Sequence, residues 1–136
     1  MSQVISHLGF IDDIWTDVEI PSLAEYDGGA FLFLKPDDDI NALGLDLSQI
    51  DLIVISFGTS ADGRGFSQAA LLRSFGYTGH IRARGHILVD QFRAALHRGI
   101  NDIEISQEQS LRNPENQWMS VSLETGYQTH LHPLEN

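Results

Sequence analysis

The sequence predicts a single α/β domain, with a βαβαβ core and a mainly parallel sheet flanked by helices. Leu52–Phe57 is a continuous apolar and β-branched run, which is typical of a strand covered on both faces. Two amphipathic segments follow it, and each is ended by a glycine and followed by a further strand pattern. A length of 136 residues is enough for one domain with a core and too short for two. We therefore assign residues 1–136 to one domain, with its core at about 51–105.

The first helix of the core is expected over residues 66–75. Its apolar positions are Phe66, Ala69, Ala70, Leu71, Leu72 and Phe75. Ser67 is expected to cap its amino end, and Phe66 is expected to pack on Leu71. Gly76 then ends the helix.

The second half of the core begins with a strand over residues 80–84, from which Gly85 leads into the second helix. The apolar positions of that helix are Leu88, Phe92, Ala95 and Leu96, at i, i+4, i+7 and i+8, and Gly99 ends it. Residues 102–105 form the third strand. Right-handed crossovers then bring the turns after the first two strands to the same edge of the sheet.

The flanking segments carry weaker patterns. Residues 1–28 have no clean period and are expected to form an irregular arm packed on a neighbouring surface. Residues 30–34 are a second candidate for a buried strand, and a short helical stretch is expected over 40–45. Residues 118–123 alternate, which favours a C-terminal edge strand, and residues 128–136 resemble a tail.

Charge sets residues 60–99 apart from the rest of the chain. The formal net charge is −11, yet six of the eight basic residues lie between positions 60 and 99, so that this segment carries +4 and the remainder −15. A cationic island concentrates small anions, whereas the acidic remainder repels polyanions. Nucleic acid and anionic membranes are therefore not expected as partners.

Composition argues against several functional classes. No apolar run approaches the ~18 residues needed to span a bilayer, which favours a cytoplasmic protein. The absence of cysteine excludes disulfides, iron–sulfur clusters, thiolate zinc sites and a thiol nucleophile. Nucleotide-binding signatures are absent too, since Gly63-Arg64-Gly65 lacks the third glycine of a dinucleotide loop. No cofactor is evident.

Two groups of potential metal ligands are assigned to solvent. The three consecutive carboxylates Asp37-Asp38-Asp39 point in different directions, as a solvated loop or a helix start allows. His130 and His132 have no further ligand at a fixed spacing. We therefore predict no metal site.

The candidate functional element is the loop Asp62-Gly63-Arg64-Gly65, between the first strand and the first helix. Its glycines permit a close approach of the backbone, so that free amides, together with Arg64 and Ser67, could hold an anion. The alternative is a tight turn in which Asp62 pairs with an arginine.

Further polar residues are expected at the same edge, because the carboxyl ends of parallel strands form the usual ligand site of open α/β sheets. Arg82 and Arg84 share one side of the second strand and would complete a clamp for the anion. His86 and Asp62 are the candidates for a general acid or base. Asp90 would orient an arginine or only favour the helix dipole. The predicted ligand-binding residues are Asp62, Gly63, Arg64, Gly65, Ser67, Arg82, Arg84, Asp90 and Gln91.

The same stretch resembles a known family. The chain is similar to the bacterial domain-of-unknown-function family 934 over about residues 10–106, most strongly over 62–91. It differs at Arg98, where a cysteine is often found, and at residues 58–61, where a proline and a second aromatic residue often precede the loop. The resemblance is carried by Asp62-Gly63-Arg64-Gly65-Phe66-Ser67, Leu71-Leu72-Arg73, Gly76-Tyr77-Thr78-Gly79, Ile81-Arg82-Ala83, Gly85 and Asp90-Gln91.

The resemblance implies a pathway rather than a mechanism. Members of the family are described as oxidoreductases involved in sulfite reduction, largely because their genes lie beside those of assimilatory sulfite reductase. Sulfite reduction passes several electrons through haem, iron–sulfur or flavin centres, for which this cysteine-free chain has no evident binding site.

We therefore expect an accessory protein of sulfur assimilation. It would bind a small anion such as sulfate, sulfite or phosphate, or a partner sulfite reductase through the acidic remainder, including Asp12-Asp13 and Asp37-Asp38-Asp39. One alternative is an enzyme that acts on a sulfur oxyanion or a phosphorylated metabolite through the arginine clamp. Another is an assembly module without a pocket. Enzyme status and oligomeric state are left open.

Overall fold

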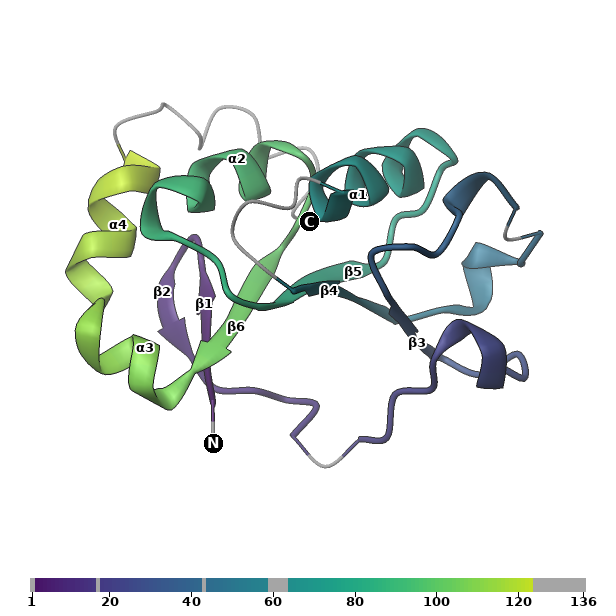
Figure 1. Cartoon of the computed structure of the whole chain (residues 1–136), viewed down its shortest axis with the longest axis horizontal. Coiled ribbons are helices and arrows are strands. Elements are labelled where there is room, and N and C mark those ends of the chain that lie inside the picture. Colours follow the sequence, from purple (N-terminus) through teal and green to yellow (C-terminus); the bar gives the residue numbers. More distant parts are fainter. Residues whose placement is uncertain (1, 17, 43, 59–63, 124–136) are drawn as a thin grey trace.

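A six-stranded sheet with the order β2-β1-β6-β5-β4-β3 forms the centre of the molecule (Figure 1). The computed structural model describes residues 2–16, 18–42, 44–58 and 64–123. Strands β3 to β6 are parallel neighbours, whereas β1 is antiparallel to β6 and β2 is antiparallel to β1. The strands are β1 (Ser2–Ser6), β2 (Gly9–Ile11), β3 (Phe31–Leu34), β4 (Leu52–Phe57), β5 (His80–Gly85) and β6 (Asp102–Ser106).

The helices α1 and α2 lie on one face of this sheet, and α3 and α4 lie beside its β1–β2 end (Figure 1). The α-helices are α1 (Arg64–Ser74), α2 (Phe92–His97), α3 (Gln107–Arg112) and α4 (Glu115–Leu123), and the short 3-10 helices are η1 (Leu23–Glu25), η2 (Ile40–Ala42), η3 (Leu47–Gln49) and η4 (Val89–Gln91). The predicted α/β class and the βαβαβ unit are therefore confirmed.

The main core lies between the sheet and the helices α1 and α2. Ile53, Ile81 and Ile103 alternate with polar or opposite-facing neighbours along their strands, and all three are fully buried against this side. Gly76 and Gly99 end α1 and α2 with φ of +94° and +92°, a conformation that only glycine adopts at little cost, as the sequence predicts.

The other face of the sheet is covered by the chain itself. The segment after β2 passes along the side opposite α1 and α2 on its way to η1 (Figure 1). Leu52 and Val54 are fully buried on this face, and Pro21 extends the cover by accepting a hydrogen bond from the Phe33 amide. The edge strand β3 is thereby shielded, because Ser22 pairs with Phe33.

Two predicted details are wrong. Residues 1–28 are not wholly irregular, because β1 and β2 form a hairpin. The apolar residues of β1 are only Val4 and Ile5, and two adjacent residues are too few to show a strand period. Residues 118–123 are not an edge strand but belong to α4. Trp118 and Val121 are spaced three apart, so six residues fit a helix as well as a strand.

Smaller corrections concern the two core helices. Ser67 does not cap α1, which already begins at Arg64. Leu88 does not face the core, since it is 43% exposed, and Ile87 is buried in its place. The predicted tail, residues 128–136, lies outside the described residues.

Candidate functional site

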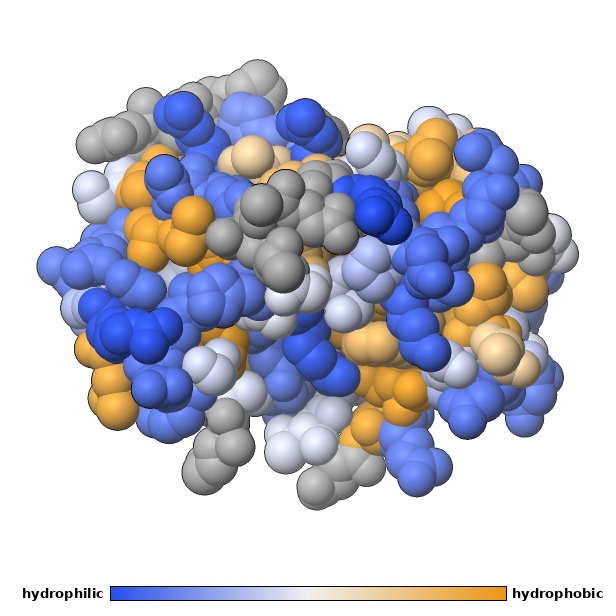
Figure 2. Space-filling model, viewed as in Figure 1, coloured by the Kyte–Doolittle hydropathy of each residue, from blue (hydrophilic) through white to orange (hydrophobic). Residues whose placement is uncertain are grey.

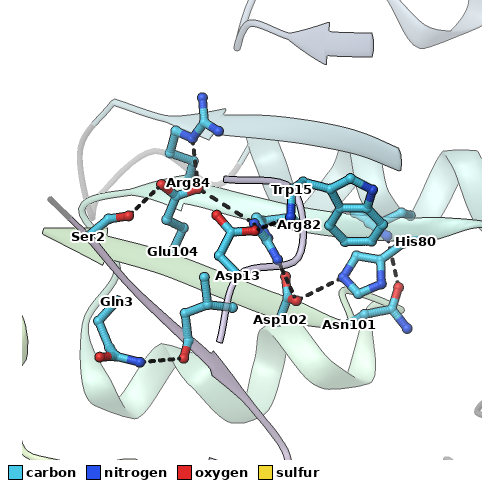
Figure 3. A network of polar contacts seen from close by, with 12 residues as sticks. Ser2, Gln3, Asp13, Trp15, His80, Arg82, Arg84, Asn101, Asp102 and Glu104 are labelled. Carbon is cyan, nitrogen blue, oxygen red and sulfur yellow. Dashed lines mark hydrogen bonds and ion pairs between the residues drawn. The ribbon is translucent and has the colours of Figure 1, made fainter. Parts of the chain in front are cut away.

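Residues of opposite charge on the neighbouring strands β5 and β6 lie side by side on the face of the sheet opposite α1 and α2 (Figure 3). The parallel register places Arg82 beside Asp102 and Arg84 beside Glu104. Because side chains alternate along a strand, all four project from the same face, and Ala83 projects into the main core. We call Arg82, Arg84, Asp102 and Glu104, together with Asp13 and His80, the charge network.

Arg82 is the centre of the charge network. It is 2% exposed, and its Nε and Nη2 donate to the two carboxylate oxygens of Asp102 at 2.8 and 3.1 Å. Its Nη1 donates to Asp13 Oδ1 at 2.9 Å, and the guanidinium carbon lies 5.3 Å from the centre of the Trp15 ring. Burial acts to lower the pKa of Arg82, but the hydrogen bonds and charges of Asp102 and Asp13 raise it above its ordinary value.

Two carboxyl groups of the network, those of Asp102 and Asp13, have lowered pKa values. Burial acts to raise the pKa of Asp102, yet its bonds to His80, at 2.8 Å, and to Arg82 lower it overall. The pKa of Asp13 is lowered in the same way: burial opposes the shift, and Arg82 and the Trp15 amide outweigh it. Asp13, expected on a free acidic surface, therefore fastens its segment to the sheet.

A pocket of about 260 Å³ opens at the end of the network, at the carboxyl ends of β5 and β6. We call it the Arg84 pocket. It is lined by Ser2, Arg84, Gly85, His86, Glu104, Ile105, Ser106 and Gln109. The sheet changes there from parallel to antiparallel, because Ser2 at the start of β1 pairs with Ser106 at the end of β6. Among the described strands, β3, β4, β5 and β6 lie side by side in the order of the chain. The strand order therefore does not reverse within the parallel part of the sheet, and the crevice that such a reversal opens for ligands in other α/β sheets is not formed there.

The polar groups of the Arg84 pocket are fixed by one another. Arg84 Nε donates to Glu104 Oε1 at 3.0 Å, and Ser2 Oγ donates to the other carboxylate oxygen at 2.8 Å. The guanidinium side chain is 41% exposed and lies over the Phe33 ring at 5.7 Å. Among the described hydrogen bonds Arg84 uses only Nε, so its two Nη groups make none there.

Of the predicted ligand-binding and catalytic residues that lie in the described part of the chain, Arg84 and His86 come together in this pocket. His86 is exposed. Arg82 was expected beside them at the ligand edge, but it belongs to the middle of β5 and is buried between two carboxylates. Another basic residue of segment 60–99 also lies away from the pocket, since Arg73 donates to the carbonyl oxygens of Tyr77, Gly79 and Gly99.

The other predicted residues lie apart from the Arg84 pocket. Asp62 and Gly63 fall outside the described residues. Arg64 is the first residue of α1, and Gly65 is buried so closely against Phe57 that a Cβ would overlap the ring. Ser67 and Asp90 are exposed, and Gln91 Oε1 accepts the Leu88 amide at 2.9 Å, which secures the start of η4.

Sequence reasoning missed several residues of this region. Asp102 and Glu104 alternate on β6 at the same spacing as Arg82 and Arg84 on β5, and this opposite alternation is the signal that could have paired them. Ser2, Ser106 and Gln109 carried no such signal.

The structure also bears on the carboxylates that were considered as metal ligands and on membrane-spanning segments. Asp38 accepts the Lys35 amide at 2.8 Å and Asp39 accepts the Asn41 amide at 2.9 Å, so both serve local turns. Within the described ranges no group of three His, Asp or Glu residues is placed to hold a metal ion. No helix in that part of the chain is long and apolar enough to cross a membrane.

Fold and site together define a small α/β protein with a mixed sheet, a buried charge network and a small pocket at the carboxyl ends of β5 and β6. The family model for bacterial proteins of unknown function (DUF934) matches residues 32–134, so the chain belongs to this family. No curated protein and no solved structure matches the chain significantly.

Proposed function

We propose that this protein binds a small sulfur oxyanion, such as sulfite or sulfate, in the Arg84 pocket as an accessory component of sulfite reduction. The observation that supports it is the partly exposed Arg84 side chain in the pocket lining, which Glu104 orients through Nε and whose two Nη groups make no hydrogen bond within the described part of the chain. Paired N–H groups of a guanidinium match the geometry of an oxyanion. His86 supplies a second donor at the same pocket.

Size favours an inorganic ion over a larger metabolite. Pockets for drug-sized ligands have volumes of about 300–1,000 Å³, whereas the Arg84 pocket has about 260 Å³ and is partly open. The carboxylate of Glu104 opposes a bound anion, which predicts weak affinity and fast exchange. The link to sulfite itself rests on the family resemblance.

Thermal unfolding with added anion tests this proposal. A ligand that binds only the folded protein, supplied at tenfold over a millimolar Kd, stabilises it by about 1.4 kcal/mol, which raises the Tm by about 3–6 °C. Sulfite and sulfate should give this shift, and sodium chloride at equal ionic strength should not.

Three variants locate the effect. Arg84→Gln should abolish the shift, and Arg93→Gln, which removes an exposed arginine of α2, should retain it. Arg64→Ala tests the loop predicted from the sequence and should also retain it. Loss of the shift in Arg64→Ala alone would move the site to that loop, and an equal shift in all three variants would reject a specific anion site.

A further inference from the structure

A larger groove lies at the opposite end of the parallel strands. It has a volume of about 660 Å³ and is half open to solvent. Its walls come from the segment before β4 and from the turn between α1 and β5, so it faces the amino ends of both strands. We call it the Tyr77 groove. It is lined by Ile40, Asn41, Gly44, Leu45, Asp46, Leu47, Ser48, Ile50, Asp51, Phe75, Gly76, Tyr77, Thr78 and Gly79.

The floor of the Tyr77 groove is apolar. Ile40, Ile50 and Tyr77 are at most 4% exposed and belong to the main core, so the floor is firm. Phe75, directly after α1, is 48% exposed and lines the same groove as these buried side chains. Figure 2 shows hydrophobic side chains reaching the surface, among hydrophilic ones, on the side that carries β3 and the short helices near it.

Tyr77 is held rigidly in place. Its hydroxyl donates to the carbonyl oxygen of Ile50 at 3.2 Å, and burial raises its pKa far above the ordinary value. Arg73 lies 5.6 Å from the ring centre but gives its N–H groups to backbone carbonyls and to Asn101. This arginine is therefore a support of the groove rather than a charge on its rim.

The rim of the groove is acidic. Asp46 and Asp51 are exposed lining residues, and the described lining contains no lysine, arginine or histidine. Asp46 is fixed, because its Oδ1 accepts the Ser48 amide at 3.1 Å and the Ser48 hydroxyl at 2.6 Å. These bonds lower the pKa of Asp46. Burial raises the pKa of Tyr26, and the charges of Asp27 and Asp46 add to this effect.

We propose that the Tyr77 groove binds a basic, amphipathic segment of a partner protein, with an apolar side chain on the floor and adjacent lysine or arginine side chains at Asp46 and Asp51. Charge complementarity carries this assignment, because an apolar floor and a rim whose charged residues are all acidic select a partner that is both apolar and cationic. A net charge of −11 also attracts a cationic segment over distance. The proposal is independent of the Arg84 pocket, which lies at the other end of the strands.

The test is a titration of ¹⁵N-labelled protein with a synthetic peptide of alternating arginine and leucine. Amide signals of Asn41, Leu47, Thr78 and Gly79 should shift, and signals of the Arg84 pocket should not. A peptide of alternating glutamate and leucine should leave the spectrum unchanged. Shifts spread evenly over the acidic surface, or equal binding of the glutamate peptide, would overturn the proposal.

Matched variants separate groove binding from general charge attraction. The double change Asp46→Asn and Asp51→Asn should weaken peptide binding about tenfold, and asparagine retains the acceptor that Ser48 needs. The control Asp12→Asn with Asp90→Asn removes two exposed carboxylates elsewhere and should change the affinity less than twofold. Equal weakening in both pairs would overturn the proposal.

Two further arms test the apolar and polypeptide parts. Phe75→Ser should weaken binding several-fold while the free protein keeps its spectrum, and unchanged affinity would contradict an apolar contact. Arginine amide alone should bind far more weakly than the peptide, and equal affinity would mean a small cationic ligand instead. Arg84→Gln should leave peptide binding intact, so that failure of the anion site and failure of the groove are distinguished.

Discussion

Asp102→Ala should destabilise the protein by about 3–5 kcal/mol, because it breaks a buried ion pair and leaves one partner without its main counter-charge. The side chains of Arg82 and Asp102 are 3% and 1% exposed, so water cannot replace the lost carboxylate. Two of the three hydrogen bonds of the guanidinium disappear, which leaves the hydrogen bond to Asp13 at 2.9 Å and a longer ion pair with Glu104 at 3.9 Å.

The loss is large on the scale of the whole fold. Domains of this size unfold with about 5–15 kcal/mol. With a urea m-value of about 1.5–2 kcal/mol per molar, the midpoint should fall by roughly 2 M. Equilibrium urea unfolding followed by circular dichroism measures this shift, and an unchanged m-value would show that the compactness of the two states is unaltered.

A double substitution distinguishes the effect of an unpaired buried charge from the effect of losing the ion pair itself. Arg82→Met combined with Asp102→Leu removes both charges and keeps the volume, so this variant should be more stable than Asp102→Ala alone. A loss below about 1 kcal/mol for Asp102→Ala would refute the reasoning, because it would mean that Arg82 is solvated or paired without Asp102.

Three other outcomes follow from the structure. The folded-state pKa values of Asp13 and Asp102 lie below the ordinary 3.8, so their contribution to stability is present above that pH and is lost as the pH falls through the folded values. Asp102→Asn should therefore flatten the acidic limb of the dependence of unfolding free energy on pH, measured by urea unfolding at a series of pH values. Gly85→Ala should cost about 1–3 kcal/mol or more in urea unfolding, because Gly85 has φ of +134° and a Cβ would overlap the Phe57 carbonyl oxygen. Trp118→Ala should cost about 3–5 kcal/mol, since the buried indole packs edge-on against Phe92 and donates to the Asn113 carbonyl oxygen, while Met119→Ala should cost less; equal effects would contradict the packing of α4.

The core of the fold could be predicted because its signals are local. Leu52–Phe57 is apolar on both faces, and Gly76 and Gly99 mark helix ends that only glycine forms easily. The hairpin β1–β2 could not, since its stability comes from pairing with β6, far along the chain. For α4 a signal was present: Pro114 directly precedes Glu115, a preferred position at the start of a helix, and it conflicted with the alternation after Trp118.

The site was harder to predict than the fold. Alternation correctly places Arg82 and Arg84 on one side of β5, but it cannot show which of them is buried. Arg82 lies under the segment of Asp13 and Trp15, whose position depends on tertiary contacts, whereas Arg84 lies nearer the strand end and stays partly exposed. The anion-binding role of either residue is still a prediction.

The pairing of the first strand with the last one has a consequence for synthesis of the chain on the ribosome. Ser2 to Ser6 pair with Ser106 to Asp102, so β1 is made about 100 residues before its neighbour exists. Val4 and Ile5 can pair with β2 early, but their other neighbour, β6, is made much later. The Asp13–Arg82 hydrogen bond can form only after β5 has been made. Such long-range closure is slow, because the entropy of joining distant segments is lost before their contacts form. Completion of the sheet should therefore follow release of most of the chain, and the exposed edges of β1 and β6 need protection until then.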